Sequence, residues 1–373
     1  MPTDIYARLR DLAASAEAKP SEMRPVLLRV TTDLFALHPQ HSTEEIHLYE
    51  EMAGKLIDSA DEATLTHVAR KLSLCADAPP SLVKRIRARG GEPEREIFRV
   101  DPQIEWRDLR HVAASGPCDL ACAVAARADL DREVARLLSA RPEREIARAL
   151  AANRLAPLNA DSLRALAPRG RDDSALARAL LDRCAPTLDF LPLYLAADPR
   201  ERAKLIALAL EASIGPGVRP ATGDVLDDET AARIEATALQ QKRAAFALLL
   251  ADRLQCDSLR ARRIVEDERG DALALAFIAI GLPQAVAARI FLIAFPRIAL
   301  SPELFERAMA LFQSVPRRVA SRIVEAITGA GRPEAANFAR GALKNPGAPA
   351  QRGQTGQRGA STPASDRRNN GAA

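Results

Sequence analysis

The sequence predicts an all-α protein, built as an irregular HEAT-like α-solenoid followed by a helical bundle and a disordered C-terminal tail. The chain has 373 residues and is 47% hydrophobic but only 4% aromatic, with Ala and Leu carrying most of the apolar share. Both are strong helix formers. Prolines recur at short intervals between Pro79 and Pro199, each at the edge of an Ala/Leu-rich segment. Because proline suits the first turn of a helix but not its interior, this pattern predicts many short helices.

Two segments near the N-terminus carry clear helix signals. Ser42 is followed three residues later by Glu45, which is the pattern of a capping box. After Asp61, the residues Leu65, Val68 and Leu72 recur at the spacing of one face of an amphipathic helix. We therefore expect a helix to begin at each of these two places.

The middle of the chain reads as a series of short helices with tight joints. We expect them at residues 117–128, 130–140, 142–153, 159–168, 172–185 and 198–213. Taken in pairs they advance by about 25–30 residues per unit, which is the scale of helical hairpins that stack into a solenoid. A single pair cannot bury its apolar face alone, so neighbouring units must cover it.

A Gly/Pro-rich segment divides this series from the C-terminal part. We expect a helical-repeat domain at residues 1–213, a linker at 214–227, a helical bundle at 228–330 and a basic, disordered tail at 331–373. Within the bundle we expect one long helix at 228–255 and shorter ones at 258–267, 271–280, 284–295, 302–314 and 316–329. The last but one has a capping serine, Ser301, followed by Pro302.

The most apolar stretch, residues 271–295, has no charge between Ala272 and Ala288. A membrane-spanning helix needs about 20 largely apolar residues. Gly281 and Pro283 divide this stretch, however, and Arg289 lies inside its second half. It therefore predicts a buried helical hairpin and not a membrane span.

The distribution of charge narrows the classes of partner. The chain has a formal net charge of +4, but residues 331–373 hold seven basic and two acidic residues, and the remainder is close to neutral. Nucleic-acid binding through the tail and local Arg clusters stays an alternative, which the neutral body disfavours. The five scattered cysteines are not a secreted disulfide framework, and the N-terminal residues lack the apolar core of a signal peptide, so we expect a cytoplasmic protein.

Residues 108–167 resemble the bacterial domain-of-unknown-function family numbered twenty-three thirty-six. The likeness rests on an A-x-R-x-x-L step at Ala125, Arg127 and Leu130 and an N-x-x-A step at Asn153 and Ala156. Residues 77–86 and 180–195 are also similar, and the likeness extends over about residues 20–330. The chain departs from the family pattern at 90–106, where a more apolar helix would be expected. The resemblance implies an all-helical, HEAT-like fold and carries no established activity.

One segment has the residues of a metal site. Glu44 and His47 form an E-x-x-H pair, with Glu51 one turn beyond. Di-iron sites in helical bundles need two such pairs, and this chain has only one. The cap at Ser42 explains the segment without metal, so we expect no metal ligand here.

Other polar residues have structural interpretations. Cys118 and Cys122 lie four apart with His111 nearby, but this is not the usual zinc spacing, so both thiols should behave as small buried hydrophobes. Arg127 and Asn153 are expected to close helix ends, the first by binding free carbonyls and the second in the left-handed conformation. The basic runs at 83–95 and 258–269 are followed closely by acids and should be solvated faces.

Sequence motifs for nucleotide binding and acyl transfer are missing from the chain. We therefore expect no catalytic residue and no cofactor. Stacked helices offer extended surfaces for protein partners. The sequence thus favours a non-enzymatic protein-interaction or scaffold module whose partner is a protein.

Overall fold

The computed structural model describes residues 23–183, 185–213 and 226–330. Within these ranges every regular element is a helix and no strand occurs, which confirms the all-α class. Most of the predicted linker and all of the predicted disordered tail, 331–373, lie outside the described residues.

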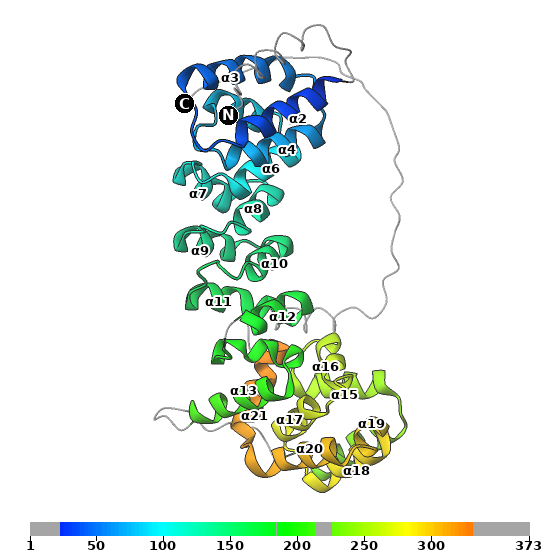
Figure 1. Ribbon diagram of the computed structural model, residues 1–373. Helices are drawn as coiled ribbons and strands as arrows, with labels where there is room; N and C mark the ends of the chain where they lie inside the picture. Colours follow the sequence, from blue (N-terminus) through cyan, green and yellow to red (C-terminus); the bar gives the residue numbers. More distant parts are fainter. Residues whose placement is uncertain (1–22, 184, 214–225, 331–373) are drawn as a thin grey trace, which may run out of the picture.

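The first half of the protein is a two-layer stack of helices (Figure 1). It begins with α2 (Met23–Ala36), α3 (Thr43–Ile57), α4 (Glu62–Ser73), α5 (Pro80–Ala88) and α6 (Gly91–Val100). Three helices continue one layer: α7 (Trp106–Ser115), α9 (Arg132–Ala140) and α11 (Ala160–Leu166). The other layer continues through α8 (Cys118–Ala125), α10 (Arg144–Ala152) and α12 (Ser174–Arg183). In both layers each helix packs against the next one in its own layer, so the stack is a solenoid.

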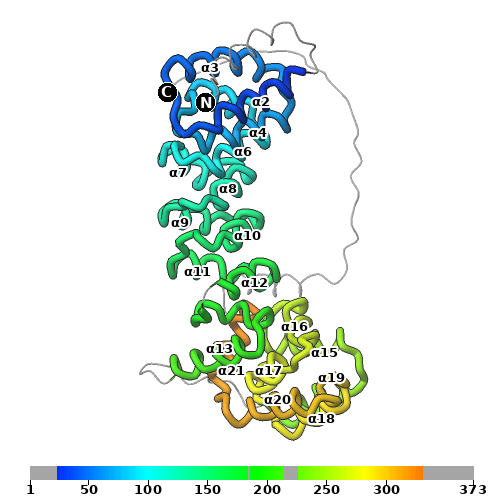
Figure 2. The backbone as a smooth tube through the Cα atoms, viewed as in Figure 1, coloured from blue at the N-terminus to red at the C-terminus, as the bar shows by residue number. Residues whose placement is uncertain are grey.

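The advance per unit agrees with the sequence pattern. In the second layer α8, α10 and α12 begin at residues 118, 144 and 174, which gives steps of 26 and 30 residues. The predicted advance of about 25–30 residues is confirmed. The elongated path that results is visible along the tube in Figure 2.

Two 3-10 helices, η1 (Ala167–Arg171) and η2 (Leu188–Ala196), and α13 (Pro199–Glu211) close the stack. The C-terminal half then contains α14 (Asp228–Leu239), α15 (Arg243–Leu254), α16 (Ser258–Val265), α17 (Asp271–Ile280), α18 (Gln284–Ala294), α19 (Pro296–Ala299), α20 (Pro302–Ser314) and α21 (Arg317–Thr328). The helix at 302–314 begins at the predicted cap, where Ser301 accepts a bond from the Leu304 amide.

The single long helix predicted at 228–255 is wrong. The chain breaks between α14 and α15, where Gln241 has a φ of 54° in the left-handed region. α14 packs on α18, whereas α15 packs on α16 and α17, so the chain must turn between them. The intervening residues 240–242 are all polar and bury nothing that would hold them in a helix.

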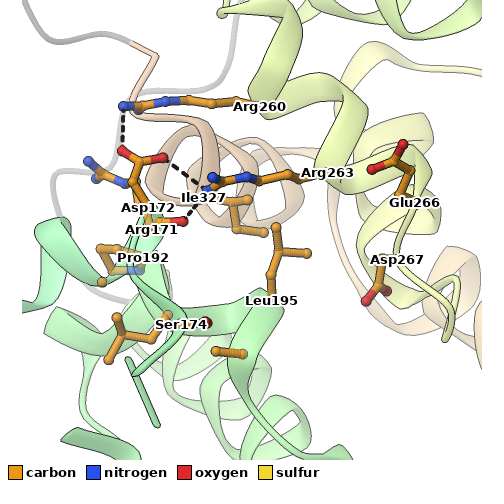
Figure 3. A pocket seen from close by; sticks show the side chains of 13 residues that line it. Arg171, Asp172, Ser174, Pro192, Leu195, Arg260, Arg263, Glu266, Asp267 and Ile327 are labelled. Carbon is orange, nitrogen blue, oxygen red and sulfur yellow. Dashed lines mark hydrogen bonds and ion pairs between the residues drawn. The ribbon is translucent and has the colours of Figure 1, made fainter. Parts of the chain in front are cut away.

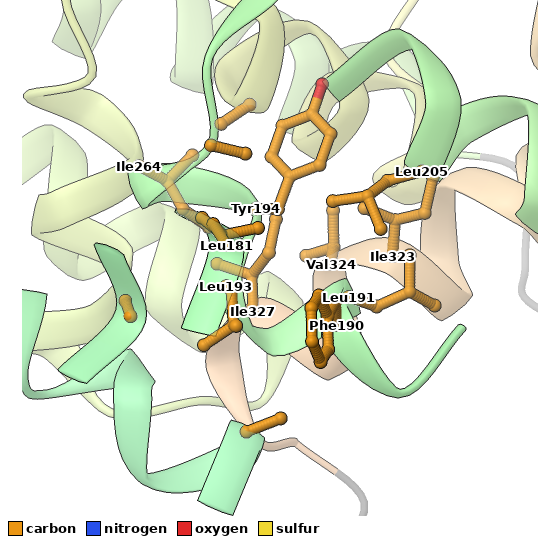
Figure 4. Packing of buried hydrophobic residues seen from close by; sticks show 14 of the residues in the cluster. Leu181, Phe190, Leu191, Leu193, Tyr194, Leu205, Ile264, Ile323, Val324 and Ile327 are labelled. Atoms are coloured by element: carbon orange, nitrogen blue, oxygen red, sulfur yellow. The ribbon is translucent and has the colours of Figure 1, made fainter. Parts of the chain in front are cut away.

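The last helix, α21, returns to the end of the solenoid and packs on η2, α13 and α17. Buried side chains from both sides of the predicted linker meet there, including Phe190 and Tyr194 of η2 and Ile323 and Val324 of α21 (Figure 4). One apolar core runs from Phe98 to Ile327, and a second lies within residues 27–97. Elements on the two sides of residues 214–227 therefore share a core, while the division into domains stays a prediction.

The apolar stretch forms the predicted hairpin. α17 is buried on nearly every side, and Gly281 ends it in the left-handed conformation with φ 79°. α18 buries Ala287, Ile290 and Phe291 on one face. Throughout the described ranges, the helices lack the combined length and apolar character that a bilayer crossing requires.

Candidate functional site

The predicted metal-binding pattern lies on an open surface. The capping box between Ser42 and Glu45 is present, and Glu44 and Glu51 are both exposed. The His47 side chain is 85% exposed and its Nδ1 lies 3.9 Å from Glu50. In the part of the chain that the structure describes, no three His, Cys, Asp or Glu side chains are grouped to hold a metal ion.

Cys118 and Cys122 share one face of α8 and pack against the larger apolar core. Burial, together with the neighbouring Cys118 thiol, raises the pKa of Cys122 to about 12. Burial also raises the pKa of Cys256 to about 11. Both are free thiols, and Cys118, Cys122 and Cys256 are all half-buried, so the predicted full burial of Cys118 and Cys122 is met only in part.

These pKa values predict low thiol reactivity. Near neutral pH, iodoacetamide should alkylate Cys122 and Cys256 in the folded chain at roughly one hundredth of the rate in urea, because the thiolate is the nucleophile. Mass spectrometry of timed samples measures both rates, with free cysteine as the reagent control. Equal rates in the folded and unfolded chain would contradict the raised pKa values of these half-buried thiols.

Arg127 and Asn153 bind backbone carbonyls of the preceding helical unit. The Arg127 side chain, which is 1% exposed, donates to the carbonyls of Phe98 at 2.8 Å and Asp101 at 2.9 Å. Asn153 Nδ2 donates to the carbonyls of Ala125 at 2.8 Å and Arg127 at 2.7 Å. The capping role predicted for Arg127 is confirmed. The left-handed conformation predicted for Asn153 is wrong, because its φ is −75° and its side chain caps the preceding unit instead.

The same device recurs along the stack. Helices leave their last carbonyls without partners inside the helix. Polar side chains that lie 25 to 33 residues further along the chain donate to carbonyls at or just beyond the ends of earlier helices. These donors are Gln103, Arg141, Arg169 and Arg183. These bonds hold successive units in register, so this set of polar residues is structural.

The low apolar content of residues 90–106 has a structural account. α6 forms there, and its Glu96 is 2% exposed in a position that an apolar residue would usually fill. Arg70 Nε at 2.5 Å and Arg99 Nε at 2.9 Å donate to its carboxylate, and these two arginines hold the pKa of Glu96 below its usual range despite burial. A buried acid between two arginines thus replaces apolar packing.

The candidate functional site is a cleft where the solenoid meets the C-terminal half. Its volume is about 410 Å³. Residues of η1, η2, α16 and α21 contribute to its walls: Gly170, Arg171, Asp172, Ser174, Pro192, Leu193, Leu195, Ala196, Arg260, Arg263, Glu266, Asp267 and Ile327. Figure 3 shows Leu195 and Ile327 between a wall with Asp172 and the arginines and a wall with Glu266 and Asp267. The cleft therefore combines an apolar floor with charged rims of both signs.

Local sequence explains how the first wall is placed. A Cβ on Gly170 would collide with the Leu193 side chain, so only glycine lets η1 approach η2 this closely. Asp173 is buried, caps α12 through the Leu176 amide at 3.1 Å, and pairs with Arg148 at 2.7 Å. This fixes the chain so that the neighbouring Asp172 turns toward the cleft.

Asp172 joins the two halves of the protein. Arg263 Nη1 donates to its carboxylate at 2.9 Å and Arg260 Nη2 at 3.3 Å. Arg263 also binds the carbonyl of Arg171. Arg171 Nε in turn donates to the Ala326 carbonyl at 2.5 Å at the end of α21. The arginines of this wall are therefore held in place by acids and carbonyls from distant segments.

Behind the opposite wall lies a buried charged cluster made of Tyr194, Arg202, Asp267 and Asp271. The Arg202 side chain is 2% exposed and donates twice to Asp267, each time at 2.8 Å. Its Nη1 lies 3.8 Å from Asp271, and its guanidinium stacks over the Tyr194 ring at 5.0 Å. Among the described protein atoms, the Tyr194 hydroxyl and Asp271 Oδ1 have no hydrogen-bond partner. Within this cluster Arg202 faces two acids, and the charges of Arg307 and Arg269 also act on Asp271.

Comparison with family models, with curated proteins and with solved structures finds no match for this chain. The resemblance to the family numbered twenty-three thirty-six therefore stays a prediction. The all-α fold is shown by the structure, and the cleft is the feature that bears on function.

The burial of the Asp271 carboxyl predicts that the stability of the protein depends on pH. Burial raises the pKa of Asp271 above its ordinary value of 3.8, and the charge of Arg202 offsets this only in part. A carboxyl whose pKa is higher in the folded state costs stability once the pH exceeds its unfolded value. The free energy of unfolding of Asp271→Asn, minus that of the natural chain, should therefore increase between about pH 4 and pH 7.

Urea unfolding of both chains at several pH values measures this difference. Asp252→Asn is the matched control, because the Asp252 side chain is 72% exposed. A difference for Asp271→Asn that falls as the pH rises would show that Arg202 outweighs burial.

Sequence reasoning found only part of the cleft. It singled out the basic run 258–269 and interpreted it as a solvated face. That description fits Arg262, which is 61% exposed and pairs with Glu266 within α16 and its C-cap at 2.6 Å. It misses the contacts of Arg260 and Arg263 with residue 172, about ninety positions earlier. The motif R-A-R-R at residues 260–263, in which three arginines flank one apolar residue, is the sequence signal that indicates this wall of the cleft.

Proposed function

We propose that the protein is a non-enzymatic interaction module that binds protein partners, with the junction cleft holding an extended peptide segment of the partner. The observation that carries this proposal is the make-up of the cleft. Pro192, Leu195 and Ile327 give it an apolar floor, and charged residues of both signs line its rims. Such a site suits a peptide with an apolar anchor flanked by charges.

The frame around the cleft supports the same function. Hydrogen bonds from each helical unit to the carbonyls of the preceding unit hold the solenoid in a fixed shape, so its surface is rigid. The charged groups of the first wall are fixed by their own partners, so little ordering is needed when a peptide binds. The free thiols at Cys75, Cys118, Cys122 and Cys256 favour a reducing compartment, and we extend the proposal to the cytoplasm.

The arrangement of the arginines favours a protein partner over nucleic acid. In the run 83–95, Arg85 pairs with Asp58 at 2.8 Å and Arg87 with Asp108 at 3.1 Å. In the run 258–269, Arg260 and Arg263 share Asp172. Nucleic-acid affinity depends on basic side chains that neutralise phosphates, and these arginines already face acids.

A peptide-display experiment tests the proposal. Random 12-residue peptides displayed on phage are selected on the full chain, and the affinities of the winners are measured by titration. Ser174 is exposed and lines the cleft at the start of α12, so Ser174→Arg should obstruct the site. We expect it to weaken the selected peptides by about tenfold or more.

Ser314→Arg is the matched control. Ser314 is also an exposed serine, but it precedes α21, whose far end borders the cleft. This variant should bind the peptides as tightly as the natural chain. Equal binding by the two variants, or selection of no peptide at all, would contradict the proposed function. Thermal melts of both variants establish that the fold is kept.

A further inference from the structure

We infer that the cleft selects acidic peptides, and that Arg263 binds a carboxylate of the ligand beside the apolar floor. The inference rests on the proposed function and deepens it. It gives the charge of the ligand a sign, and it assigns a specificity-determining residue to the cleft.

The first argument is the unused edge of the Arg263 guanidinium. Arg263 donates through Nη1, to the Asp172 carboxylate at 2.9 Å and to the Arg171 carbonyl. Among the described residues, its Nε and Nη2 have no hydrogen-bond partner. A guanidinium presents five N–H donors in a fixed fork. The donors at Nε and Nη2 therefore stay available to a ligand.

The second argument is that this edge matches a carboxylate. The N–H groups at Nε and Nη2 are parallel, so they can bind the two oxygens of one carboxylate together. Arg127 uses these two atoms to bind Asp129, at 2.8 and 2.7 Å. Arg289 uses them to bind Glu235, at 2.5 and 2.9 Å. The edge that holds an acid in these two arginines is open in Arg263.

The third argument is where this edge lies. Arg263 lines the cleft together with Leu195 and Ile327, whose side chains contribute to the apolar floor (Figure 3). The Arg263 side chain is 47% exposed, and its two bonds through Nη1 hold it in place. A ligand that buries an apolar residue on the floor can therefore bring a neighbouring carboxylate to Arg263, and the arginine needs little further ordering.

The fourth argument is the charge of the first wall. Arg260 and Arg263 share the Asp172 carboxylate, at 3.3 and 2.9 Å. Arg260 also binds the Thr328 carbonyl, which carries no formal charge. This pair of arginines therefore holds one positive charge more than the acid that they share. One carboxylate of a ligand would balance that charge, whereas nucleic acid is bound by many cations together.

The opposite wall gives a basic ligand little to bind, because its acids have cations of their own. Glu266 pairs with Arg262 at 2.6 Å. Asp267, whose side chain is only 9% exposed, pairs with Arg202 at 2.8 Å. A basic residue of the ligand would have to compete with one of these pairs. An acidic residue gains more at Arg263, so the cleft discriminates between the two charges.

Two peptide libraries displayed on phage and selected on the full chain test the inference. Both have a fixed central leucine, and their charged residues are only Asp and Glu in one library and only Lys and Arg in the other. Binding is titrated with and without Ser174→Trp, a bulky neutral substitution that obstructs the cleft without attracting acids. We expect the peptides that this substitution excludes to come from the acidic library, with affinities at least about tenfold higher than any from the basic library.

A double-substitution cycle assigns the acid to Arg263. Each Asp or Glu of the tightest acidic peptide is replaced in turn by its amide. One replacement should weaken binding to the natural chain by about tenfold and leave binding to Arg263→Gln unchanged. Arg233→Gln is the matched control, because it removes the same charge from an exposed residue of α14 outside the cleft. It should keep the tenfold preference.

Salt gives a second measurement that needs no substitution in the protein. Raising sodium chloride from about 0.1 M to about 1 M should reduce the preference for the acidic peptide over its amide several-fold, because the added ions screen the half-exposed Arg263. Binding through the apolar anchor alone would be equally tight or tighter in high salt for both peptides.

The outcomes separate the two proposals. Peptides that bind the cleft equally well from both libraries, or amide replacements that cost the same with Arg263→Gln, would overturn the inference and leave the proposed function intact. A single-stranded DNA that displaces the acidic peptide and binds more weakly to Arg263→Gln would assign the open edge to phosphate, which also overturns the inference. If Ser174→Trp excludes no peptide from either library, the proposed function fails and the inference fails with it.

Discussion

Arg202→Met is expected to lower the free energy of unfolding by about 3–5 kcal/mol, because it leaves two buried acids without their cation. Arg202 pairs with Asp267 at 2.8 Å, and its Nη1 lies 3.8 Å from Asp271. It also donates to the carbonyls of Ala197 at 3.1 Å and Leu195 at 3.0 Å. Methionine can fill much of the volume, but it donates no hydrogen bond. Denaturant titration followed by circular dichroism measures the loss.

The pH dependence of this loss identifies its cause. Burial already raises the pKa of Asp271, and without Arg202 its charge is opposed less, so the loss should shrink as the pH falls and the Asp271 carboxyl becomes protonated. Arg202→Met combined with Asp267→Asn should recover part of the loss at neutral pH. Arg262→Met is the matched control and should change stability by less than about 0.5 kcal/mol, since Arg262 is 61% exposed. A loss independent of pH would point to packing alone.

The helices of the solenoid could be predicted because their signals are local. A capping residue, a proline at the first turn and an apolar face all lie within a few residues of each other. The capping box at Ser42 is an example from the solenoid, and the cap at Ser301 shows the same in the C-terminal half. The burial of α17 was also predictable, since a segment that is apolar on every side can only be covered on every side.

The features that the sequence concealed depend on distant neighbours. The break at Gln241 follows from the different partners of α14 and α15, and nothing within residues 228–255 names those partners. η2 contains Pro192 and was missed as an element because its 3-10 turns are held by packing on α21. The number of residues per solenoid unit could be predicted from the sequence, but the residue at which the stack ends could not.

The cleft was hidden for the same reason. Asp172 and Arg263 lie 91 positions apart, and each alone looks like an ordinary surface charge. Arg127 was easier, because its partner carbonyls lie in the preceding unit and the capping chemistry of an arginine near a helix end is general. Contacts between adjacent units could thus be predicted in kind, whereas contacts between the two halves of the protein could be found only from the fold.

Arg127→Met is expected to lower the free energy of unfolding by about 3 kcal/mol, the second large effect. The substitution leaves the carbonyls of Phe98 and Asp101 without the donors that reach them across the unit boundary. Each buried carbonyl that loses its partner costs roughly 1–3 kcal/mol. The pair with Asp129 contributes little to this total, because the Asp129 side chain is 56% exposed.

Arg136→Met is the matched control in the next helix. The Arg136 side chain is 49% exposed and pairs with Glu133 of its own helix, so its loss should cost less than about 0.5 kcal/mol. Hydrogen exchange adds a readout that global stability does not give. With Arg127→Met, amides at the C-terminus of α6 should exchange faster than those of α10, because the bond that is lost caps α6. Uniform acceleration along the whole stack would show instead that Arg127 acts through global stability and not as the cap between two particular units.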